Sequence, residues 1–244
     1  MDNFQEFEQT NGPERTAGSI ISHAFEMYKS LFLYAILAMV IYFIASMLVQ
    51  SVSGFDSMAF SEEMQAADGD FSSMDFLAIP GMSTYYGLSG LLGILLAPLY
   101  VGLIYMANKI NFKQQIVFAD LFIGYKQNFV NILVYALISS ILTSIAFMLC
   151  VIPGFFVLPF FLLGYPILLF ENATFSEALS KSFAIAKENY GVFLGASLLG
   201  LLISIAGVFL CGIGLVATIP FYLVVMYSTY CAFCGRPRPI EFSN

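Results

Sequence analysis

The chain has 244 residues, of which 59% are hydrophobic and only 10% are charged. Soluble domains carry about 25% charged residues, so this composition excludes a water-soluble globular protein. The net charge is −7 and the nine basic residues form no clustered stripe, which excludes a nucleic-acid-binding surface.

Residues 1–15 form an acidic N-terminal segment that we expect to be disordered. The segment has four acids, and its single base, Arg15, stands at its end. A secretory signal would begin with basic residues and continue into a short apolar core. The first apolar run here starts near Leu31 and has full spanning length, so we expect it to be retained as a helix.

Six apolar segments without a charged residue or a histidine follow along the chain. A helix needs about 20 mostly apolar residues to cross a bilayer, and a backbone in lipid must satisfy its own hydrogen bonds. We therefore predict an all-α polytopic membrane protein with about six transmembrane helices. The predicted spans are Leu31–Gln50, Tyr85–Ala107, Phe129–Cys150, Phe155–Phe170, Tyr190–Cys211 and Leu215–Phe233. The fourth is short and contains two prolines, so a full span and a kinked or partly re-entrant path both stay open.

The basic residues flank these segments on one side only. They are Arg15, Lys29, Lys109, Lys113, Lys126, Lys181, Lys187, Arg236 and Arg238. The loop 51–84 carries six acids and no base. Because basic residues stay in the cytoplasm, we predict cytoplasmic N- and C-termini and an extracytoplasmic acidic loop.

Two independent patterns in the sequence predict an internal repeat of three units. The pattern Phe-x-x-x-Lys-x-x-aromatic occurs as Phe25, Lys29 and Phe32, as Phe122, Lys126 and Phe129, and as Phe183, Lys187 and Tyr190. Pro98, Pro159 and Pro220 are 61 residues apart, one in each even-numbered span. Lys126 and Lys187 are also 61 apart, whereas Lys29 and Lys126 are 97 apart, so we interpret the acidic loop as an insertion in the first unit.

The predicted organisation is a single membrane domain, 16–234, followed by a cytoplasmic tail, 235–244. It contains three parallel helical-hairpin repeats, approximately 16–110, 111–172 and 173–234, with the insertion at 51–84. Apolar stripes predict a short interfacial entry helix before each odd-numbered span, lying in the headgroup layer or packed on the bundle. We interpret the repeated lysines as anchors to anionic headgroups. Rows of small residues, such as Ser89, Gly93 and Ala97, predict close helix packing, within the chain or in a homo-oligomer.

The spans contain no acid, base or metal ligand, and the single histidine, His23, precedes the first span. We therefore predict no catalytic, cofactor-binding or metal-binding residues, no cofactor and no enzymatic activity. Cys231 and Cys234 end an apolar helix and are interpreted as buried apolar residues. Whether Cys150 and Cys211 pair stays open.

The second half of the chain resembles a known family in its turn and helix-entry residues. The run begins with Ile152-Pro153-Gly154, Pro159 and Glu171, and continues with Phe175–Phe183 and Lys187–Tyr190. It is similar to bacterial six-helix membrane proteins related to the membrane domain of some glycerophosphoryl diester phosphodiesterases. The resemblance implies six helices in a bacterial cytoplasmic membrane and carries over no catalytic residue.

Two functions fit these observations. The first is non-enzymatic organisation of the membrane, with lipids, a membrane-protein partner or a second copy as the partner. The alternative is a transporter or channel for a small or lipidic solute along the axis that relates the repeats.

Overall fold

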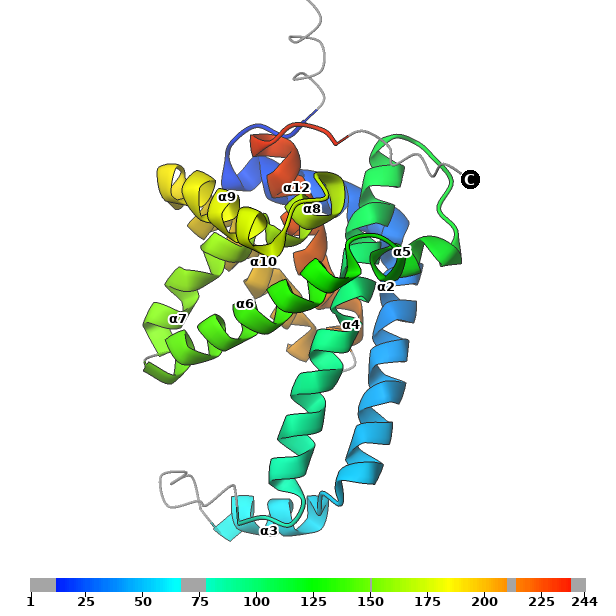
Figure 1. Ribbon diagram of the computed structural model, residues 1–244, viewed down its shortest axis with the longest axis vertical. Helices are drawn as coiled ribbons and strands as arrows, with labels where there is room; N and C mark the ends of the chain where they lie inside the picture. The colour runs from blue at the N-terminus through cyan, green and yellow to red at the C-terminus, as the bar shows by residue number, and fades with distance from the viewer. Residues whose placement is uncertain (1–11, 67–77, 150, 210–213, 238–244) are drawn as a thin grey trace, which may run out of the picture. The chain divides into compact units, whose positions relative to one another are not determined.

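The computed structural model describes residues 12–66, 78–149, 151–209 and 214–237, and every regular element in these ranges is a helix (Figure 1). The longer elements are α2 (Ala17–Ser53), α3 (Ser57–Ala66), α4 (Met82–Asn111), α6 (Phe129–Leu149), α9 (Phe175–Glu188), α10 (Tyr190–Ile205) and α12 (Phe221–Phe233). The shorter ones are η2 (Phe118–Phe122), α5 (Ile123–Lys126), α7 (Val151–Val157), η3 (Leu158–Phe161), α8 (Gly164–Phe170), η4 (Ala206–Phe209) and α11 (Gly214–Thr218).

Six helical segments are long and apolar enough to cross a membrane. They are Ala17–Ser53, Met82–Asn111, Phe129–Leu149, Val151–Phe170, Tyr190–Phe209 and Gly214–Phe233. The prediction of an all-α polytopic membrane protein is therefore confirmed. The fourth segment has 20 residues, enough for a complete crossing, although it is interrupted by a 3₁₀ turn at η3.

The entry helix and the odd-numbered span are separate in two places and continuous in the third. Asn128 separates α5 from α6 with a φ of 53°, and Asn189 separates α9 from α10. The residue at the corresponding position of the first repeat motif is Leu31, which lies inside the 37-residue helix α2. Asparagine tolerates the left-handed region and favours helix ends, whereas leucine favours helix interiors. This difference explains why the first entry helix and span form one element.

The three spaced prolines also act differently. Pro98 lies inside α4, which continues around it. Pro159 lies in η3, and Pro220 precedes α12 at a break after α11. Proline lacks an N–H group and its ring crowds the preceding turn, so a break is its ordinary effect. Two strong helix formers, Leu96 and Ala97, stand directly before the proline that is tolerated.

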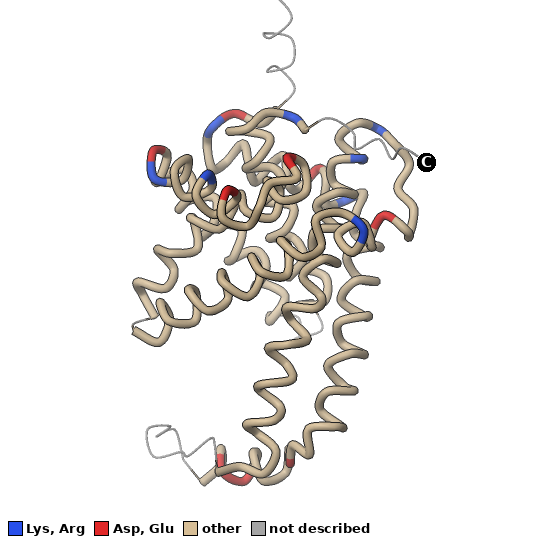
Figure 2. The backbone as a smooth tube through the Cα atoms, in the orientation of Figure 1, with Lys and Arg blue, Asp and Glu red and all other residues tan. Residues whose placement is uncertain are grey.

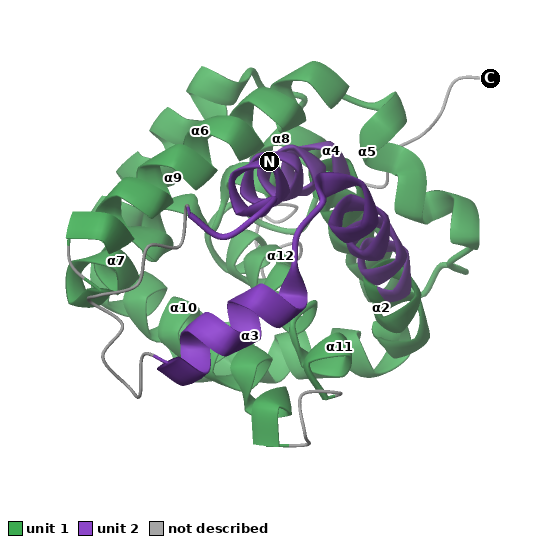
Figure 3. Ribbon diagram, turned by 90° about the horizontal axis from the view of Figure 1, so that it is seen from below, with its two compact units in different colours: residues 1–39, 97–244 green, residues 40–96 purple. Residues whose placement is uncertain are grey.

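The chain forms two compact units, coloured in Figure 3. Unit 1 consists of 1–39 and 97–244, and unit 2 consists of 40–96. Within unit 1, α12 lies toward the centre in Figure 3, and 61% of the residues in its spanning window are buried, against 22% for α6. The segment that contains α12 is therefore more enclosed by the rest of the chain than α6 is.

The charged residues of unit 1 that the structure describes gather at one end (Figure 2). All eight described Lys and Arg residues belong to this unit. At this end α9 buries Ala178, Ser182 and Ala186 and packs on η3 and α8, so packing on the bundle describes this entry helix. Thr174 and Glu177 cap the first turn of α9 with a capping box. Hydrogen bonds from the Thr174 amide and hydroxyl lower the pKa of the Glu177 carboxyl.

Unit 2 is held at its turn by a few specific contacts. Asp56 accepts hydrogen bonds from the amides of Met58 and Ala59, at 2.9 and 3.1 Å, and so caps α3. The rings of Phe55 and Tyr85 stack at 5.0 Å between centroids. The acidic insertion is therefore partly helical, with its residues 67–77 outside the described part.

Candidate functional site

The charged end of unit 1 is the place where polar groups from distant parts of the chain meet. Three polar contacts join an entry segment to an even-numbered span. The second and fourth spans contact the entry segments that follow them, and the sixth span contacts the first entry segment. His23 Nδ1 and Ser228 Oγ share a hydrogen bond of 2.9 Å. Lys109 Nζ lies 2.8 Å from Asp120 Oδ2, and Lys181 Nζ lies 2.6 Å from Glu171 Oε2.

The entry-segment members of these contacts are His23, Asp120 and Lys181. They are 97 and 61 residues apart, the same spacings as the repeated lysines. No shared residue type marks these three positions in the sequence, because the first carries an imidazole, the second a carboxylate and the third an ammonium group. The spacing alone could have found them.

The repeated aromatic residues make a second set of contacts around the same end. Phe183 stacks on Phe160 with ring centroids 4.7 Å apart, and Phe25 approaches Phe221 at the same distance. Phe160 and Phe221 are 61 residues apart and each follows a spaced proline. The motif phenylalanines at 183 and 25 therefore contact residues that the predicted repeat would make equivalent.

Tyrosine hydroxyls bind the carbonyls of the turn before two of the prolines. Tyr190 donates to the carbonyl of Phe156 at 2.9 Å, and Tyr28 donates to the carbonyl of Ala217. Both carbonyls lie three residues before a proline, at Pro159 and Pro220, where the regular helical ladder is interrupted. The hydroxyls supply partners that lipid cannot supply.

A buried polar cluster connects α4 with α12 at this end. Tyr227 donates to Asn108 Oδ1 at 2.9 Å and accepts from Asn111 Nδ2 at 2.8 Å. Arg236 donates to the carbonyl of Asn111, and its guanidinium lies 3.8 Å from the centre of the Phe112 ring. Arg236 Nε is buried without a hydrogen-bond partner among the described residues, but the other contacts join the C-terminal segment to α4, so the arrangement is structural.

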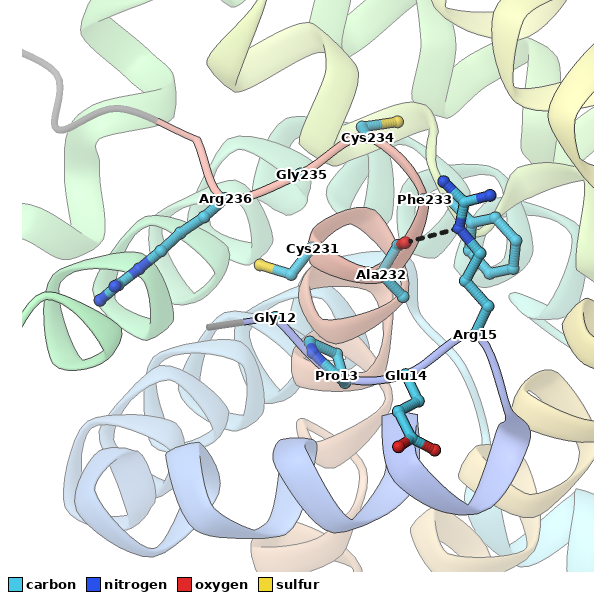
Figure 4. Close-up of a pocket in the computed structure, with 10 residues that line it drawn as sticks. All are labelled: Gly12, Pro13, Glu14, Arg15, Cys231, Ala232, Phe233, Cys234, Gly235 and Arg236. Atoms are coloured by element: carbon cyan, nitrogen blue, oxygen red, sulfur yellow. Dashed lines mark hydrogen bonds between the residues drawn. The ribbon is translucent and has the colours of Figure 1, made fainter. Parts of the chain in front are cut away.

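Cys231 and Cys234 line a cavity of about 700 Å³ between residues 12–15 and 231–236 (Figure 4). Arg15 donates from Nε to the carbonyl of Ala232 at 3.2 Å, while Arg236 extends away from the rest of the lining. Cys231 is buried, and burial raises the pKa of the Cys234 thiol to about 11. A protonated thiol is a poor nucleophile, so this cavity lacks an activated cysteine.

The lysines of the repeat motif lie apart from these contacts. Lys29, Lys126 and Lys187 are all exposed, and each precedes its motif aromatic, Phe32, Phe129 or Tyr190, by three residues. Cys150 and Cys211 lie outside the described residues, as do Arg238 and the tail beyond it. Comparison with family models, curated proteins and solved structures finds no match to this chain.

Proposed function

We propose that this chain is a non-enzymatic protein of the bacterial cytoplasmic membrane that organises lipids or a membrane-protein partner around a ring of three helical-hairpin repeats. The spaced contacts at the charged end of unit 1 carry this proposal. Each links the even-numbered span of one proposed repeat to the entry segment of the next.

The contact between Phe25 and Phe221 closes the ring, because it joins the first repeat to the third. Parallel repeats that stack in a circle cover each other's apolar faces and leave no unpaired terminal repeat. Such an assembly is a rigid platform whose outer surface faces lipid.

The buried side chains of unit 1 favour a platform over a transport path. Leu103, Leu163 and Val224 come from the three even-numbered spans, lie 60 and 61 residues apart along the chain, and are at most 1% exposed. A solute path along this axis would need polar side chains or open space at that level. Large apolar residues there oppose the transporter alternative.

The distribution of charge supports cytoplasmic termini. The described basic residues gather at one end of unit 1, and the insertion in unit 2 carries acids and no base. Moving basic residues across a membrane is disfavoured, so the basic end belongs in the cytoplasm. The resemblance to the membrane domain of glycerophosphoryl diester phosphodiesterases supports the bacterial cytoplasmic membrane as the location.

Native mass spectrometry of the chain released from mild detergent tests the function. We expect retained lipid or a retained partner, and the subunit count is read from the same spectrum. A bare monomer, together with solute flux through the protein in liposomes, would replace the platform with a transporter.

Cysteine labelling in intact cells tests the orientation separately. In a variant without the four native cysteines, Ser61→Cys should react with an impermeant maleimide from outside. The matched Ser180→Cys, which is exposed on α9, should react only after lysis. The reverse pattern would invert the topology.

A further inference from the structure

The motif lysines differ from four of the other five described cations of unit 1 in making no ion pair or hydrogen bond among the described residues. Four described cations are used internally: Lys109 and Lys181 form ion pairs, and Arg15 and Arg236 bind backbone carbonyls. The other four are Lys29, Lys113, Lys126 and Lys187, which are exposed and make no ion pair or hydrogen bond among the described residues. Three of these four are motif lysines.

Each motif lysine precedes by three residues an aromatic residue at the start of an odd-numbered span. A long lysine side chain can extend its ammonium into the headgroup layer while its stem covers apolar surface. Aromatic rings such as that of Tyr190 concentrate at the same depth. Lys113 lies in the connection after α4 and has no aromatic residue at the motif spacing, so it is a natural control.

The nearby acids leave these ammonium groups unneutralised. Glu26 and Glu188 are close along the chain to Lys29 and Lys187, yet the described residues show ion pairs only at Lys109 and Lys181. A cation held at headgroup depth without an internal counter-ion attracts anionic lipid, while a zwitterionic headgroup offers its phosphate together with a repelling ammonium. The three motif lysines therefore favour lipid headgroups with a net negative charge.

We propose that Lys29, Lys126 and Lys187 form three headgroup sites for anionic phospholipid, one in each repeat. The inference rests on the proposed function, because it requires the basic end to face a leaflet that contains anionic lipid. It adds the lipid class, the number of sites and the residues that bind.

Titration of the purified full chain with phosphatidylglycerol or phosphatidylethanolamine, followed by native mass spectrometry, tests these sites. We expect up to three tightly bound phosphatidylglycerol molecules on the unaltered chain. Because each lysine contributes about 1 kcal/mol, each of Lys29→Gln, Lys126→Gln and Lys187→Gln should weaken one of the three sites roughly fivefold. The triple variant should weaken all three sites by about that factor. Lys113→Gln should retain all three lipids.

Three outcomes would overturn the sites. The first is an unchanged phosphatidylglycerol count in a triple variant that still elutes as a folded monodisperse protein. The second is equal retention of phosphatidylethanolamine, and the third is displacement of the lipid by inorganic phosphate. Lipid that stays bound independently of the lysines would end this inference and leave the proposed function standing. Failure of the unaltered chain to retain any lipid or partner would end both.

Discussion

The ring of Phe25 lies 4.7 Å from the ring of Phe221, which places the first entry segment against the last spanning segment. The pair of Phe160 and Phe183 has the same centroid distance. Two contacts between residues that correspond in the proposed repeat therefore have the same centroid distance. Their interplanar angles differ, at 48° and 27°.

A double-mutant cycle should measure the ring-closing contact directly. We expect Phe25→Ala and Phe221→Ala to show a coupling free energy of about 1 kcal/mol in unfolding experiments in detergent, because aromatic pairs contribute beyond their buried area. The pair of Phe160 and Phe183 should give a similar value. Additive effects for both pairs would show that the contacts do not stabilise the ring, and Phe25 combined with Phe183 is the additive control.

Two glycines should be intolerant of a methyl group because backbone approaches them. A Cβ atom on Gly102 would overlap the backbone of Leu121, and one on Gly124 would overlap the backbone of Pro98. We expect Gly102→Ala and Gly124→Ala to lower the free energy of unfolding by about 1–3 kcal/mol. Gly90→Ala is the control, because it lies in the same helix as Gly102 with open space around it. Equal stability of Gly90→Ala and Gly102→Ala would contradict this close packing.

Asn128 should be required both for its backbone conformation and for its amide group. Its φ is 53°, and its Nδ2 donates to the carbonyls of Leu168 and Ala173 at 2.9 and 2.7 Å. We expect Asn128→Leu to lower the free energy of unfolding by about 2–4 kcal/mol, since it adds backbone strain and leaves buried carbonyls without partners.

Asn128→Gly separates these two contributions because glycine adopts a positive φ without strain. Its loss should be roughly half that of the leucine variant, on the order of 1–2 kcal/mol from the missing amide bonds. A glycine variant as unstable as the leucine variant would remove backbone strain from the explanation.

Cys234 should alkylate slowly at neutral pH. Burial raises the pKa of its thiol to about 11, so the thiolate needed for attack on a maleimide is scarce at pH 7 and increases about tenfold with each pH unit up to that pKa. Reaction rates of a variant retaining only Cys234, measured from pH 7 to pH 9, check this expectation. A fast, pH-independent rate would indicate an activated thiol, and Ser180→Cys in the same cysteine-free background provides the exposed reference.

The sequence by itself determined the membrane character of the chain and the approximate positions of all six spans. Hydrocarbon admits only long uncharged segments with internal hydrogen bonding, and that requirement acts on each segment independently of the others. The predicted span Phe129–Cys150 and the observed helix Phe129–Leu149 accordingly begin at the same residue.

Tertiary structure alone decided which segments meet at the charged end. The partners of His23, Asp120 and Lys181 share no chemistry, and His23 lies 205 residues from Ser228, so no local pattern announces the contact. The break at Asn128 is also held by tertiary contacts, because the Asn128 amide binds carbonyls of α8 and of the turn after it. Spans follow from the solvent around each segment, whereas pairing follows from contacts between segments that the chain order keeps far apart.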